Sequence, residues 1–152
     1  MGTKVEILSD IPDCPHPELS QPISRACEAA TAISGVEAEV EFACLLTKGP
    51  KMRKLNREFR GVDQETDVLA FPREEGHPGG DIAIAVDHAR MNAEAADVPV
   101  HEEVSYLAVH AALHLLGYDH DNDADYRSMR AAEDRALTVM GLAPRPNSDD
   151  LS

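Results

Sequence analysis

The sequence PVHEEVSYLAVHAALHLLGYDH occupies residues 99–120 and begins with a proline that suits the first turn of a helix. Its apolar residues recur at helical spacing as far as Leu116, and Gly117 can end a helix in the left-handed conformation. Helical patterns also cover residues 88–97 and 124–140, and Gly141 follows the second of them. The sequence therefore predicts three helices in the second half of the chain.

Towards the N-terminus, shorter apolar segments have the character of strands. Between Glu37 and Leu46 the apolar period changes to two, which is typical of a strand with one face in a core. Three further strands are predicted at Val5 to Leu8, Asp67 to Phe71 and Asp81 to Val86. A stretch that contains glycine and proline separates the last two.

Two more helices are predicted between these strands. For the first, Ser20 is the expected cap, Pro22 lies in the first turn and Gly35 ends the helix. The second covers residues 49–61, and its expected inward row consists of Met52, Leu55 and Phe59.

Four strands and about five helices, with the helices gathered in the C-terminal half, predict an α+β fold. The chain of 152 residues has the size of one ordinary domain. We expect a single domain, residues 1–142, in which a small four-stranded sheet is packed by the helices, and a flexible tail, residues 143–152.

The composition limits the partners of the protein. The chain has 28 acidic and 14 basic residues and a formal net charge of −14, so a polyanion must bind at a local basic patch. No apolar run approaches the roughly 20 residues that span a bilayer, and the N-terminus lacks the layout of a signal peptide. We therefore expect a soluble, cytoplasmic protein with no membrane partner. Cys14, Cys27 and Cys44 are expected to be inert thiols, because they lack the spacing of a disulfide framework or a zinc ribbon.

Three histidines, His110, His114 and His120, give the strongest chemical signal. Residues four apart in a helix are neighbours on one face, so the first two imidazoles can point at one metal ion. A turn at Gly117 can bring His120 back towards them. Three imidazoles with one open position are typical of a catalytic Zn²⁺, which lowers the pKa of bound water to about 7. The sequence predicts one zinc ion and a hydrolytic reaction.

The spacing H-x3-H-x2-G-x2-H is also that of metzincin peptidases, in which a glutamate after the first histidine acts as general base. Here that position is Ala111, which cannot transfer a proton. A zinc metallopeptidase with an unrecognised base remains an alternative interpretation.

A basic segment reverses the acidic charge locally. Six of the 14 basic residues lie between Lys48 and Arg60, where Glu58 is the single acidic residue. Arg53, Arg57 and Arg60 share one face of the predicted helix, and guanidinium groups pair well with phosphate oxygens. A solvated face whose charges pair with acidic neighbours is an equally good interpretation.

Four blocks, LNREFRG, TDVLAFP, GDIAIA and HAALHLLGYDH, occur in this order in a match that covers roughly residues 55 to 141. Together they closely resemble the bacterial YbeY-type rRNA maturation factors, which are metal-dependent endoribonucleases of the small ribosomal subunit. The sequence departs from the family pattern at Ala111, where glycine is usual, and at Ala70, where serine is usual. The second change removes a hydroxyl near a motif that is expected to line the cleft.

The resemblance implies a zincin-like α+β domain with one Zn²⁺ at the end of a helix in the C-terminal half. It implies that His110, His114 and His120 bind the metal, and that Arg60 is catalytic and stabilises negative charge in the transition state. It also implies cleavage of single-stranded RNA in rRNA processing, including the 3′ end of 16S rRNA, and in ribosome quality control. The implied partners are the small ribosomal subunit and its associated proteins. A non-catalytic ribosome assembly factor with a structural zinc is a further alternative, which the net charge slightly favours.

Overall fold

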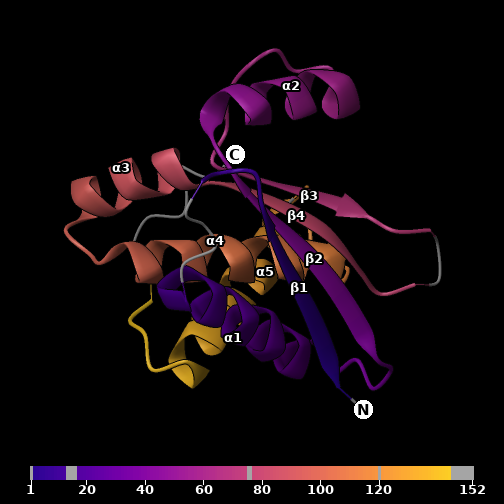
Figure 1. Ribbon diagram of the computed structural model, residues 1–152. Helices are drawn as coiled ribbons and strands as arrows, with labels where there is room; N and C mark the ends of the chain where they lie inside the picture. The colour runs from indigo at the N-terminus through magenta and orange to yellow at the C-terminus, as the bar shows by residue number, and fades with distance from the viewer. Residues whose placement is uncertain (1, 13–16, 75–76, 120, 145–152) are drawn as a thin grey trace.

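The computed structural model describes residues 2–12, 17–74, 77–119 and 121–144 (Figure 1). Its elements, in chain order, are β1 (Thr3–Ser9), α1 (Pro17–Ser34), β2 (Val40–Thr47), α2 (Gly49–Arg60), β3 (Val68–Pro72), β4 (Gly79–Ala85), α3 (Val86–Ala96), α4 (Val100–Leu115) and α5 (Asp123–Val139). The predicted α+β class, with four strands and five helices in one domain, is confirmed. The predicted flexible tail lies outside the described residues from residue 145 onward. None of the described helices is long and apolar enough to span a membrane.

The four strands form one mixed sheet in the order β1-β2-β4-β3. The neighbours β1, β2 and β4 are parallel, and β3 pairs antiparallel with β4 at one edge. Parallel neighbours need a crossover connection, and α1 supplies the one between β1 and β2. The connection from β2 to β4 contains both α2 and the edge strand β3, which places these two elements beside each other.

The two faces of the sheet are covered very differently (Figure 1). Along β2, Phe42, Cys44 and Leu46 alternate into the main core, which α1, α4 and α5 share on one face. On the opposite face a smaller core joins Met52 of α2 to side chains of β3 and β4. Within the helical layer α4 contacts α1, α3, α5 and two strands, so it is buried on nearly every side. Side chains on α4 are therefore held by a rigid scaffold.

Two local predictions are wrong. The first helix, α1, begins at Pro17, so Ser20 and Pro22 lie within it, and Ser20 is not its cap. Pro17 itself occupies the start of the helix, where a missing backbone N–H has no cost. Phe59 is 65% exposed, although its place in the row with Met52 and Leu55 predicts burial. The reason is that α2 extends beyond the small core, where the Phe59 ring packs edge to face against Phe71 of the edge strand.

The two described cysteines behave as predicted. Cys27 and Cys44 are buried free thiols, and Cys14 lies outside the described residues. Burial raises the pKa of the Cys44 thiol to about 12 and raises that of Cys27 well above its ordinary value, with a smaller contribution from Cys44. Both thiols therefore stay protonated and unreactive at neutral pH.

Gly79 is the residue at which β4 can approach β2. Its φ is +99°, and a Cβ there would lie 2.2 Å from the backbone oxygen of Glu41. Replacing Gly79 with alanine is therefore expected to lower the free energy of unfolding by about 2 kcal/mol or more, because backbone strain adds to a clash that no side-chain rotation relieves.

Gly35→Ala is the matched control for urea unfolding of this variant. Gly35 has a φ of +76°, but no atom lies within 4 Å of the position of its Cβ. Its substitution measures the cost of the backbone conformation alone. Equal unfolding midpoints for the two alanine variants would contradict the predicted clash at Gly79.

Candidate functional site

The C-terminal end of α4 carries two of the three predicted metal ligands. His110 and His114 lie one helical turn apart on this helix, and both are partly exposed although most of α4 is buried. The helix ends at Leu115, and the chain turns at Gly117 with a φ of +105°, as the sequence predicts. His120 lies outside the described residues. Consistent with this, no group of three potential ligands gathers within the part of the chain that the structure describes.

His110 is held by a carboxylate that the sequence analysis did not identify. Its Nδ1 lies 2.5 Å from Oε2 of Glu133, which is 3% exposed and comes from α5. The inward row of α5 is otherwise apolar, consisting of Met129, Ala132, Ala136 and Leu137. An acidic residue within an apolar helical row is costly unless it is paired, and this is the sequence signal that could have revealed it.

The bond to Glu133 determines which nitrogen of His110 can bind a metal. A carboxylate only accepts hydrogen bonds, so Nδ1 of His110 donates, and in a neutral imidazole Nε2 is then the nitrogen that can bind a metal. Metal-binding histidines commonly carry such a carboxylate on the second ring nitrogen, where it fixes the tautomer and the ring orientation. The donor chemistry at this end of α4 therefore fits a metal ion.

The basic face predicted on α2 is partly neutralised. Arg53 donates to both carboxylate oxygens of Asp63, at 2.8 and 3.1 Å, and Arg57 lies 3.8 Å from the same carboxylate. Hydrogen bonding and charge from Arg53 hold the pKa of Asp63 below its usual range. Arg60, the last residue of α2, is exposed and forms no ion pair with another described residue. Among the three arginines of the predicted face, Arg60 is therefore the one whose charge is not paired with Asp63.

The ends of α2 and α4 meet the sheet at the same place but on opposite faces. The ring of Phe59, next to Arg60, lies 5.3 Å from the ring of Phe71 on β3. A Cβ on Gly80 would lie 2.4 Å from the backbone oxygen of Phe71 and 3.1 Å from Cδ2 of Leu115, the last residue of α4. The contacts of Phe59 and Leu115 therefore meet at the same edge of the sheet, formed by β3 and β4.

The mixed sheet carries a histidine pair on α4 and the exposed Arg60 at the end of α2, an arrangement that an α+β hydrolase can use. A model of the family described as Endoribonuclease YbeY matches residues 6–141, and the chain belongs to this family. The resemblance predicted from four sequence blocks is confirmed and extends towards the N-terminus. The family consists of nucleases, so the predicted enzyme class is also confirmed.

Similar proteins agree with this assignment. The chain is 39% identical over 145 residues to "Endoribonuclease YbeY" of Bradyrhizobium diazoefficiens, with 88% of this chain and 79% of the relative covered. It is 36% identical over 136 residues to a relative of the same name from Caldanaerobacter subterraneus, with 79% and 86% covered. The solution structure of TM1509 from Thermotoga maritima is similar in fold, with a TM-score of 0.60 at 23% identity and coverage of 97% of this chain and 99% of that one.

Proposed function

We propose that this protein is a zinc-dependent endoribonuclease that cleaves single-stranded RNA during rRNA maturation. Its Zn²⁺ would be bound by His110, His114 and His120, and Arg60 would be the catalytic arginine. The observation that carries the proposal is the bond between Glu133 and His110, one turn from His114, in a chain that belongs to an endoribonuclease family.

The residues divide the chemistry between them. A bound Zn²⁺ supplies polarisation of a phosphoryl oxygen and activation of water. His110 would present Nε2 to the metal because Nδ1–H donates its hydrogen bond to Glu133, and α4 holds His114 one turn away. Arg60 would place its planar guanidinium against phosphate oxygens and stabilise the charge that develops on them.

The wider role belongs to the same proposal. We place the protein in the cytoplasm, acting on rRNA of the small subunit, including the 3′ end of 16S rRNA, and in ribosome quality control. The net charge of −14 weakens non-specific binding to RNA. Ribosomal proteins of the small subunit would therefore supply part of the positioning that the enzyme's own charge does not provide.

The two alternatives have less support. A metallopeptidase needs a general base after the first histidine, where this chain has the buried Ala111, and it assigns no role to Arg60. A non-catalytic assembly factor could use the histidines to stabilise its fold with a structural zinc, but this reading gives Arg60 no function.

An end-labelled single-stranded RNA tests the proposal directly. Protein loaded with Zn²⁺ is expected to cleave it, and protein treated with chelator is not. The chemistry of the new 3′ end then distinguishes attack by the 2′-hydroxyl, which leaves a cyclic 2′,3′-phosphate, from attack by water. Cleavage of casein without cleavage of RNA would favour the peptidase, and cleavage of neither would favour the assembly factor.

The pairing of Asp63 with two arginines makes a quantitative prediction about RNA affinity. Replacing Asp63 with alanine is expected to tighten binding of single-stranded RNA about two- to five-fold at low salt, because Arg53 and Arg57 would then face phosphates unpaired. Fluorescence anisotropy against salt concentration measures this effect.

Glu94→Ala is the control for the loss of one negative charge. Glu94 is an exposed residue of α3, an element that lies next to α2 but outside the basic face. An equal gain in affinity from Asp63→Ala and Glu94→Ala would show that net charge, and not release of the arginines, is responsible.

A further inference from the structure

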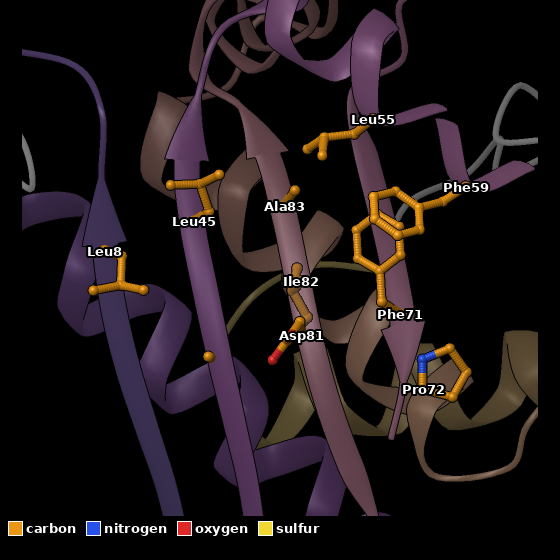
Figure 2. A pocket seen from close by; sticks show the side chains of 10 residues that line it. Leu8, Leu45, Leu55, Phe59, Phe71, Pro72, Asp81, Ile82 and Ala83 are labelled. Carbon is orange, nitrogen blue, oxygen red and sulfur yellow. The ribbon is translucent and has the colours of Figure 1, made fainter. Parts of the chain in front are cut away.

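An open, mainly apolar groove of about 540 Å³ crosses the face of the sheet that α2 covers only partly (Figure 2). Leu8 of β1 lies at one side, and Leu55 and Phe59 of α2 lie at the other. Leu45 of β2 and Ala83 of β4 contribute to the floor between them. This groove is separate from the histidine pair, which lies beyond the sheet on α4.

The wall of the groove nearest α2 is aromatic. Phe59 and Phe71 contact each other edge to face, with ring planes 65° apart, and Figure 2 shows both rings beside the open space. Phe59 is 65% exposed, so its ring presents a large apolar surface to solvent. An exposed phenyl ring beside a concave apolar surface is suited to stacking on a flat ligand.

Charged residues of α2 and β4 lie near or within the groove. The helix α2, whose Leu55 and Phe59 line the groove, also carries the exposed basic residues Lys51, Lys54 and Arg60, whereas Arg57 lies 3.8 Å from the carboxylate of Asp63. Asp81 of β4 is also exposed and lies within the groove itself (Figure 2). Positive charge on the rim favours a polyanion there, whereas the carboxylate keeps phosphate out of the groove and can accept a hydrogen bond from an amino group.

We propose that this groove binds an unpaired base of single-stranded RNA, stacked on Phe59, while the flanking phosphates contact the basic side of α2. Asp81 would accept from the exocyclic amino group of the base, which favours cytosine over uracil. A protein segment could also fill an apolar groove, but the basic rim complements phosphates and matches the substrate class of the proposed function, on which this inference rests.

The position of the groove fits such a substrate. Phe71 contacts Phe59 in the groove and also lies against Gly80, on which Leu115 of α4 packs from the other side. The groove and the histidine end of α4 are therefore separated by the thickness of the sheet at its β3 edge. An RNA strand with one base in the groove would then continue around this edge towards His114.

Fluorescence anisotropy tests the proposal by measuring how tightly the full-length, zinc-loaded protein binds short 2′-O-methyl oligocytidine and oligouridine. The integrity of both probes is checked on a gel. Phe59→Ala is expected to weaken binding of oligocytidine about ten-fold, the loss of one base stacked on an aromatic ring. Met91→Ala is the control, because Met91 is 67% exposed on α3 and does not line the groove. Asp81→Ala is expected to remove the preference for cytidine over uridine.

Each outcome bears on the groove separately from the proposed function. Unchanged affinity in Phe59→Ala, or an equal loss in Met91→Ala, would overturn the groove as a base-binding site even if the parent protein cleaves RNA. Conversely, a loss confined to Phe59→Ala in a protein that binds RNA without cleaving it would support the groove and contradict the endoribonuclease proposal.

Discussion

Replacing His114 with alanine is expected to reduce the rate of RNA cleavage more than loss of a residue that only supports a metal ligand. Loss of such a supporting residue costs roughly 10- to 100-fold. His114 is one of two predicted ligands that α4 holds a single turn apart, and no neighbouring residue of the helix can replace its imidazole. The loss should lie in catalysis, because the basic side of α2 and the groove beside it remain intact.

His101→Ala is the matched control for this variant. His101 is an exposed residue in the first turn of α4, at the opposite end of the helix from His114. Cleavage of end-labelled RNA should be normal in this control, and RNA affinity should be normal in both variants. Equal cleavage by His114→Ala and the parent protein would contradict the assignment of His114 as a metal ligand. If chelator also had no effect on this cleavage, the activity would come from a contaminating ribonuclease.

The histidine helix was predictable because its information is local. The spacing of His110 and His114, the apolar pattern around them and Gly117 all lie within one stretch of sequence, and a buried helix leaves little choice of geometry. The alternation along β2 was predictable for the same reason, since its inward residues are buried in the order that the pattern gives.

The contacts of the site were less predictable, because they depend on which elements meet. Glu133 is separated from His110 by 23 positions and by a turn, so their bond follows from the packing of α5 on α4. The pairing of Arg53 with Asp63 depends in the same way on the loop after α2. The exposure of Phe59 follows from how little of the sheet α2 covers, which periodicity alone cannot indicate.

Glu133 is the residue outside the predicted ligands whose substitution should matter most. Replacing it with glutamine is expected to lower the affinity for Zn²⁺ about 10- to 100-fold, the usual effect of removing a carboxylate from a metal-binding histidine. The amide is nearly the same size and its oxygen can still accept from Nδ1 of His110, so the fold should survive. What the variant loses is the negative charge that makes the imidazole a stronger ligand and that opposes rotation of its ring.

Competition with a chromogenic chelator measures this affinity without reference to RNA cleavage. Asp134→Asn is the control, because Asp134 follows Glu133 on α5, is partly exposed, and does not belong to the buried row of the helix. A ten-fold or greater loss of affinity in Glu133→Gln alone, with an unfolding midpoint close to that of Asp134→Asn, would identify Glu133 as a positioning residue for His110. Equal metal affinities in the two variants would instead mean that the buried pair only joins α4 to α5, and the case for His110 as a ligand would lose its main structural support.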